Sequence, residues 1–178
     1  MMVNKKSFRQ QSLTVLSNEI KHAYIKDKRI VSTLYQYIKK ENIHSIMLYI
    51  PMKSEVNLFP LIKQLRKEKR QVYTPFMEGK SFRLVKYRLP LYKKQFGIQE
   101  PNNSKKYKSR TIDLAIVPIV GVDATLRRVG FGKGMYDRFF EKERKNIKKI
   151  IFVARKLCYT HRVVTDHYDV EADMIVVP

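Results

Sequence analysis

The feature that most constrains the fold is a concentration of glycine in one short segment. The chain has six glycines, and four of them lie between residues 121 and 134. An apolar run at 114–117 precedes this segment and is typical of a buried strand. Residues 135–144 follow it and have helical composition. The order of strand, glycine-rich loop and helix start predicts that backbone N–H groups and the positive end of a helix dipole converge there.

Basic side chains in the same segment indicate that the loop binds an anion. Arg127, Arg128 and Lys133 lie among the glycines, so we expect a phosphate at this point. The segment is not a Walker A loop, because Gly134 replaces the required Ser or Thr and Arg127 stands at the first Gly position. It also fails the dinucleotide fingerprint, because Met135 occupies the last Gly position. The alternative is a loop whose glycines only permit positive φ.

The segment also carries a longer pattern of glycines, acids and basic residues. Its members are Asp123, Arg128, Gly130, Gly132, Gly134, Tyr136, Asp137 and Arg138. On these residues the chain resembles the 5-formyltetrahydrofolate cyclo-ligase (5,10-methenyltetrahydrofolate synthetase) family. Two positions depart from the family pattern: Leu126 stands where Gly is usual, and Met135 stands where the first Tyr is usual. The resemblance covers nearly the whole chain, and its most specific part is this segment.

Length and composition favour one globular domain over residues 1–178. The alternation of strand-like and helical segments predicts an α/β fold, a three-layer αβα domain with a mainly parallel sheet. We expect no membrane partner, because no apolar run is long enough to span a bilayer and the first residues lack the apolar core of a signal peptide. The single cysteine, Cys158, excludes an internal disulfide and fits the cytoplasm. We favour a monomer.

The net charge of +21, from 37 Lys and Arg against 16 Asp and Glu, favours anionic partners. The basic residues are spread through the chain, which is typical of a solvated surface. A basic nucleic-acid-binding protein is the alternative function. No helix-turn-helix spacing, aromatic RNA signature or zinc ligand set supports it, so we do not expect nucleic acid as a partner. A third hypothesis is an enzyme of the same fold that acts on a different substrate.

Apolar spacing predicts the other elements along the chain. A long loop, 90–110, is expected to line the ligand cleft, and within it Gly97-Ile98-Gln99-Glu100-Pro101 resembles a segment of bacterial family members. The expected helices are 5–22, a second around 30–38 and one that begins near Pro60, and the expected strands are 45–50, 71–74 ending at Pro75, 81–87 and 149–154, with a turn at 78–80.

Two basic residues near the N-terminus lie four positions apart and share one helix face, Lys5 and Arg9. Spacing alone favours a solvated basic face. The family has a Lys and an Arg at this spacing, and the resemblance implies that they contact ATP phosphates. The ATP-binding residues that it implies are Lys5, Lys6, Ser7, Phe8, Arg9, Arg128, Val129, Gly130, Phe131, Gly132, Lys133, Gly134, Met135 and Tyr136.

The loop after the strand at 45–50 is well placed for a ligand, because open α/β sheets bind ligands beyond the carboxyl ends of their strands. Glu55 lies in this loop. The resemblance implies that it contacts the pterin ring, whose aminopyrimidine edge can donate two parallel N–H bonds to a carboxylate. A capping or surface role is the alternative. The implied substrate-binding residues are Ile50, Met52, Glu55, Phe131, Gly132, Lys133, Gly134 and Met135.

Asp137 and Asp169 match acids that serve a magnesium site in the family, and Tyr168 replaces its usual His. Mg²⁺ favours carboxylate, water and phosphate oxygens. The alternatives are a helix-dipole role for Asp137 and a loop cap for Asp169.

The reaction that the resemblance implies is ATP-dependent cyclisation of 5-formyltetrahydrofolate, with or without a polyglutamate tail, to 5,10-methenyltetrahydrofolate, with release of ADP and phosphate. The formyl oxygen would first be phosphorylated. Arg128 and Tyr136 are the implied catalytic residues.

Overall fold

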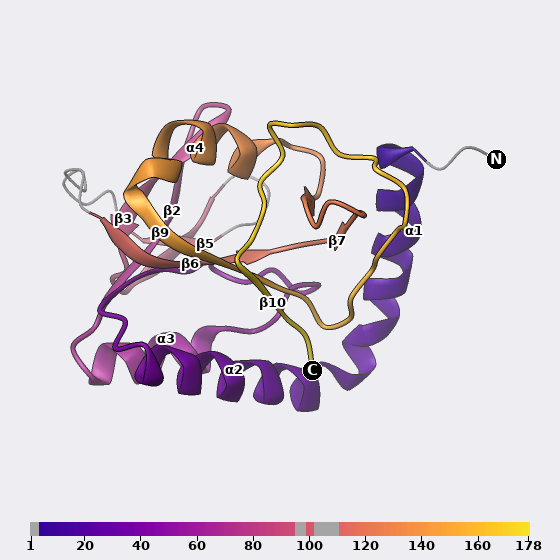
Figure 1. Cartoon of the computed structure of the whole chain (residues 1–178). Coiled ribbons are helices and arrows are strands. Elements are labelled where there is room, and N and C mark those ends of the chain that lie inside the picture. Colours follow the sequence, from indigo (N-terminus) through magenta and orange to yellow (C-terminus); the bar gives the residue numbers. More distant parts are fainter. Residues whose placement is uncertain (1–3, 95–98, 102–110) are drawn as a thin grey trace.

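The computed structural model describes residues 4–94, 99–101 and 111–178. Their centre is a six-stranded sheet with the strand order β10-β9-β6-β1-β2-β3 (Figure 1). Neighbouring strands are parallel except β2 and β3, which form an antiparallel hairpin, so the prediction of a mainly parallel α/β sheet is confirmed. The strands of this sheet are β1 (Ser45–Met47), β2 (Gln71–Glu78), β3 (Ser81–Lys86), β6 (Ile112–Pro118), β9 (Ile147–Val153) and β10 (Met174–Val176).

Helices form layers on both faces of the sheet (Figure 1). α2 and α3 cover one face, α4 covers the other, and α1 stands beside the sheet. The expected helix at 5–22 is too long: the α-helix ends at Asn18 and a short 3-10 turn leads into the next helix. The helical elements are α1 (Lys5–Asn18), η1 (Glu19–His22), α2 (Ala23–Lys40), α3 (Phe59–Lys67), α4 (Met135–Glu143) and η3 (Arg144–Asn146).

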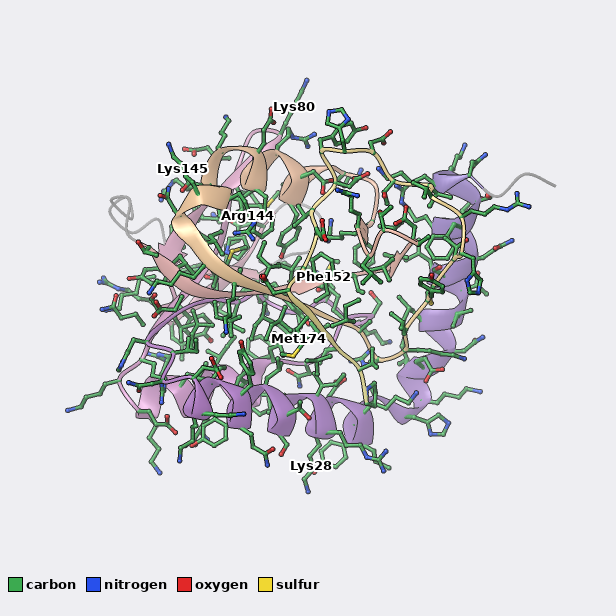
Figure 2. All side chains as sticks on the ribbon, viewed as in Figure 1. Lys28, Lys80, Arg144, Lys145, Phe152 and Met174 are labelled. Atoms are coloured by element: carbon green, nitrogen blue, oxygen red, sulfur yellow. The ribbon has the colours of Figure 1, made fainter. Side chains whose placement is uncertain are left out.

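Two apolar cores hold these layers together. Ile30, Leu34 and Ile38 recur every four residues on α2, and they are fully buried against the sheet and α3. On the opposite face, Phe139 of α4 packs over Phe152, which Figure 2 labels near the middle of the sheet. Burial of each such side chain stabilises the fold by about 1.5–3 kcal/mol.

The labelled lysines of Figure 2 lie on the outside of this framework. Lys28, Lys80 and Lys145 point away from the cores and are exposed. They come from α2, from the turn after β2 and from η3, so they do not form one basic face.

The prediction that the strand at 71–74 ends at Pro75 is wrong, because β2 continues to Glu78. Proline is tolerated inside β2 because β1 pairs with β2 only as far as Tyr73. Beyond that residue, β3 is the one strand of the described ranges that pairs with β2. The expected turn is confirmed: Gly79 has a φ of 60° and joins β2 to β3.

Residues 90–110 are not simply a loop. β4 (Leu91–Lys93) pairs with β5 (Gln99–Pro101) in a small antiparallel sheet. Gly97 and Ile98 lie outside the described residues. A second small hairpin, β7 (Gly121–Val122) with β8 (Arg128–Val129), forms the first part of the glycine-rich segment. The sequence pattern had predicted an unbroken loop over 121–134, but the loop is confined to 130–134.

The turn of the β7–β8 hairpin places Leu126 in the left-handed region, with a φ of 57°. Its N–H donates to the carbonyl of Asp123, and its side chain is half-exposed. The family pattern described above has glycine at this position. Leu126 therefore adopts a backbone conformation that favours glycine, and this conformation strains the backbone.

Leu126→Gly is expected to stabilise the protein. The left-handed conformation costs a residue with a Cβ about 1–2 kcal/mol. The greater freedom of glycine in the unfolded chain offsets about 0.5–1 kcal/mol of that gain. We expect a rise in Tm of roughly 1–4 °C in thermal denaturation. Leu157→Gly is the control, because Leu157 is similarly exposed but has no positive φ, and it should lower Tm. A fall in Tm for both variants would contradict the strain.

Candidate active site

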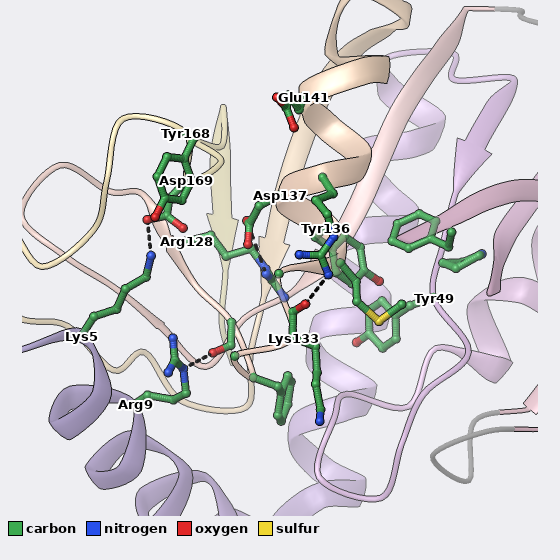
Figure 3. Close-up of a pocket in the computed structure, with 18 of the residues that line it drawn as sticks. Lys5, Arg9, Tyr49, Arg128, Lys133, Tyr136, Asp137, Glu141, Tyr168 and Asp169 are labelled. Carbon is green, nitrogen blue, oxygen red and sulfur yellow. Dashed lines mark hydrogen bonds and ion pairs between the residues drawn. The ribbon is translucent and has the colours of Figure 1, made fainter. Parts of the chain in front are cut away.

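A cavity of about 920 Å³ brings together five segments that are far apart in the sequence (Figure 3). They are the start of α1, the loop after β1, the β2–β3 hairpin, the glycine-rich loop with the first turns of α4, and the segment at 166–169. The predicted site residues that line it are Lys5, Arg9, Ile50, Met52, Glu55, Arg128, Gly130, Phe131, Gly132, Lys133, Gly134, Met135, Tyr136, Asp137 and Asp169.

Four predicted ATP-binding residues do not line the cavity: Lys6, Ser7, Phe8 and Val129. Phe8 and Val129 are buried together in a small apolar cluster beneath the loop. Ser7 caps α1 by exchanging hydrogen bonds with Asn4. In this conformation Phe8 and Val129 support the loop, Ser7 supports the start of the helix, and Lys6 is exposed.

Glycine is required in this loop for two different structural reasons. Gly132 and Gly134 have φ values of 93° and 62°, which favour glycine, and Gly134 is the N-cap of α4. Gly130 does not have a positive φ. A Cβ built there would lie 2.2 Å from Nη1 of Arg128, so the absence of a side chain lets the guanidinium lie against the loop. Backbone freedom alone therefore does not account for this segment.

Arg128 is the buried cation of the site. Its Nε donates to the carbonyl of Pro118 at 3.0 Å, and its guanidinium carbon lies 4.6 Å from the ring centre of Tyr136. Its Nη1 lies 3.9 Å from Oδ1 of Asp137. Because arginine keeps its charge when buried, these contacts place a fixed positive charge in the cavity wall beside the glycine-rich loop.

Asp137 and Asp169 both line the cavity, and each carries a carboxylate of the kind that could help to hold a divalent cation. Burial raises the pKa of Asp137, Arg128 opposes that rise, and Oδ1 of Asp137 is buried without a hydrogen-bond partner. Asp169 is buried and accepts from the N–H of Asp166 at 2.7 Å. Within the described ranges no group of three His, Cys, Asp or Glu side chains could hold a metal. Mg²⁺, however, needs only one or two carboxylates when phosphates and water complete its coordination.

The two basic residues of α1 are not on a solvated face. Lys5 forms an ion pair with Asp169 and a second with Asp166 at 3.3 Å, as Figure 3 shows for Asp169. Nε of Arg9 donates to the carbonyl of Gly130 at 2.7 Å. The first two turns of α1 are thereby fastened to the glycine-rich loop and to the segment at 166–169.

Glu55 supplies an acidic group in an otherwise apolar part of the cavity. Its side chain is buried, and one oxygen accepts from the N–H of Met52 at 2.8 Å. Burial raises the pKa of Glu55 to about 7. Ile50 and Phe82 line the same cavity. A flat apolar ligand with N–H donors on one edge would match this arrangement.

Comparison with known proteins decides the family. The family model for 5-formyltetrahydrofolate cyclo-ligases matches residues 1–178. The chain belongs to this family. It is 25% identical over 179 residues to the 5-formyltetrahydrofolate cyclo-ligase of Mycoplasma genitalium, covering 98% of each chain, and 30% identical over 152 residues to the probable enzyme of Schizosaccharomyces pombe, covering 75% of this chain and 74% of that one.

A solved structure of a family relative agrees with the fold. The 5,10-methenyltetrahydrofolate synthetase of Aquifex aeolicus superposes with a TM-score of 0.79 at 29% identity, over 97% of this chain and 89% of that one. The chain is therefore a cyclo-ligase family enzyme with an α/β fold. Among the described residues no helix combines the length and apolar character needed to cross a membrane.

The cyclo-ligase cavity also contains residues that were missed in the sequence. Phe82 of β3 lies 5.1 Å, centre to centre, from the ring of Tyr136, and Pro75 and Met77 line the wall from β2. Alternation along 81–87 predicted a strand there, but it did not indicate that the β2–β3 hairpin reaches the site. The described part of 90–101 contributes no lining residue, in contrast to the expectation for that segment.

Proposed function

We propose that this enzyme converts 5-formyltetrahydrofolate and ATP into 5,10-methenyltetrahydrofolate, ADP and phosphate. The observation that carries the proposal is that one cavity gathers two chemically different sets of groups. The glycine-rich loop, Arg128 and the α4 N-terminus suit a polyphosphate. The apolar walls around Glu55 suit a pterin. Family membership supplies the substrate class for both sets.

In the proposed first step the formyl oxygen attacks the γ-phosphorus of ATP. An oxygen–phosphorus bond forms, the bond to the β-phosphate oxygen breaks, and ADP leaves. N10 of the folate then attacks the activated formyl carbon and loses its proton, and the carbon–oxygen bond breaks as phosphate departs. Both nucleophiles belong to the substrate, so the protein supplies position and charge.

Different residues of the cavity would bind the phosphates, the pterin and the metal ion. Arg128, Lys5, Arg9 and the N–H groups of 130–134 would hold the phosphates, and Glu55 would accept N–H bonds from the pterin. The ring of Tyr136 packs against the guanidinium of Arg128 and fixes its plane. Asp137 and Asp169 would hold Mg²⁺, which neutralises phosphate charge when bound.

The test is absorbance-monitored formation of methenyltetrahydrofolate from 5-formyltetrahydrofolate with and without Mg-ATP. We expect product only when Mg-ATP is present. Folded protein that binds ATP but forms no product would point to another substrate on the same fold. Failure to bind ATP at all would overturn the phosphate role of the loop and favour the nucleic-acid alternative.

The KM for 5-formyltetrahydrofolate is expected to fall as pH rises from 6 to 8. The pKa of Glu55 is raised to about 7, so the carboxyl group is largely protonated at pH 6 and ionised at pH 8. Only the ionised form accepts two N–H bonds from a pterin edge. Steady-state kinetics across this range measure the effect, and Glu55→Gln should remove it. A wild-type KM that does not change with pH would contradict this role for Glu55.

The remaining properties of the proposed enzyme follow from composition. The single cysteine supports a reducing compartment, the cytoplasm. The net charge of +21 would suit a folate with an anionic polyglutamate tail. We expect a single-domain monomer, which analytical ultracentrifugation would test.

A further inference from the structure

A buried ion pair lies behind the cavity wall, between α2 and the segment after β9. Nε of Arg155 donates to Oδ1 of Asp27 at 2.8 Å, and Nη2 donates to Oδ2 at 2.9 Å. The side chains are 5% and 11% exposed. Two parallel hydrogen bonds between a guanidinium and a carboxylate fix the relative orientation of both groups.

The other hydrogen bonds of this pair go to the backbone of one loop. Nη1 of Arg155 donates to the carbonyl of Lys53 at 3.1 Å, and Oδ2 of Asp27 accepts from the N–H of Asn57 at 3.1 Å. The two contacts lie two residues before and two residues after Glu55. The pair therefore holds both sides of the loop that carries the acidic group of the cavity.

The loop between these contacts is short and internally bonded. The N–H of Glu55 donates to the carbonyl of Met52 at 3.0 Å, while the Glu55 carboxylate accepts from the N–H of Met52. A shift of Lys53 or Asn57 would therefore move the carboxylate with the loop. Neither Asp27 nor Arg155 lines the cavity, so the pair would act on a ligand from behind the wall, mainly through this loop. Burial raises the pKa of Glu55 to about 7, and the charges of Arg128 and Arg155 oppose that rise, so Arg155 also acts on the carboxyl group through its charge.

Stability alone is a weak reason for a buried ion pair, because well-packed apolar residues in its place are often as stable or more stable. We propose that Asp27 and Arg155 are positioning residues that hold Glu55 in place in the cavity and thereby set the affinity for 5-formyltetrahydrofolate. The inference rests on the proposed function of Glu55. A displacement of about 1 Å at such a group is sufficient for a large kinetic effect.

The test uses two changes of the pair. Arg155→Lys keeps a positive charge beside Asp27. It loses the planar guanidinium, which bonds Asp27 and the carbonyl of Lys53 simultaneously. The double variant Asp27→Leu/Arg155→Met removes both charges together, so no single buried charge is left unpaired. For both we expect the KM for 5-formyltetrahydrofolate to rise about 10- to 100-fold. The KM for ATP should change less than about twofold, and amide hydrogen exchange at 52–57 should be faster.

Asp113→Asn is the matched control. Asp113 accepts hydrogen bonds from His44, Ser45 and Lys148 and ties β1 to β6 at the other end of the strands. Loss of the Asp113 carboxylate should lower Tm, but it should not raise the KM for 5-formyltetrahydrofolate more than the KM for ATP. A folded double variant with wild-type folate KM would overturn the inference. Folded wild-type protein that forms no product would overturn the proposed function itself, and the folate role of the pair with it.

Discussion

Arg128→Ala is expected to lower kcat and kcat/KM together, by about 100- to 1000-fold. The Arg128 guanidinium is a buried cation beside the glycine-rich loop, and its position is fixed by Pro118 and Tyr136. Charge that develops on the transferred phosphoryl group would meet a guanidinium that is itself buried, where electrostatic contacts are stronger than in bulk water. Steady-state kinetics of methenyltetrahydrofolate formation, at saturating and limiting ATP, would measure both constants.

The neighbouring Arg127 provides a matched control. It does not line the cavity, and its ion pair with Glu171, at 3.6 Å, lies near the surface. Arg127→Ala should therefore keep kcat within about twofold of the wild-type value, since an exposed ion pair contributes little. An unchanged kcat in Arg128→Ala, or an equal loss in both variants, would contradict a direct role of Arg128 in the transition state.

Asp123→Asn is expected to destabilise the fold by about 1.5–3 kcal/mol and to lower Tm by roughly 3–12 °C. Asp123 is fully buried and accepts hydrogen bonds from the backbone N–H groups of Thr125, Val164 and Thr165 and from both threonine hydroxyls. An asparagine has one carbonyl oxygen instead of two acceptors, and its NH₂ group would face N–H donors. Thermal and urea denaturation at pH 7 would measure the loss.

The pH dependence of this effect has a defined sign. Burial would raise the pKa of Asp123, but the hydrogen bonds from Thr125, Thr165 and Val164 outweigh burial and bring it well below its usual range. The contribution to stability is therefore present above the unfolded pKa, about 3.9, and is lost as pH falls below it. The difference between wild type and Asp123→Asn should shrink from pH 5 to pH 2. Glu171→Gln, at an exposed side chain, should change Tm little at any pH.

The parts of the fold that depend on local pattern could be predicted from the sequence. Ile30, Leu34 and Ile38 repeat at the helical period, and the continuous apolar run in β6 is typical of a strand buried on both faces. The end of β2 could not be predicted in this way. Whether Pro75 ends a strand depends on how far β1 extends beside it, which is a property of another segment.

In the active site, too, local pattern predicted some features, and others depended on residues far away in the sequence. The glycine-rich loop is one continuous segment, so its glycines and Arg128 could be found together. Asp123 was recognised only as part of that pattern, because its partners Val164 and Thr165 lie about 40 residues away. The pairing of Asp27 with Arg155 spans 128 residues. A single Asp on an amphipathic helix looks like a surface residue until the distant arginine is placed beside it.

The position of α1 has a consequence for protein synthesis. Phe8 and Leu16 pack against Val120, Val129 and Cys158, and Lys5 pairs with Asp169, so every one of these partners is translated long after the helix. At about 5–20 residues per second, the synthesis of α1 is complete roughly 8–30 seconds before Asp169 is made. A helix of 14 residues is only marginally stable alone. The cavity therefore lacks the wall that α1 supplies until the first and last parts of the chain meet, late in synthesis.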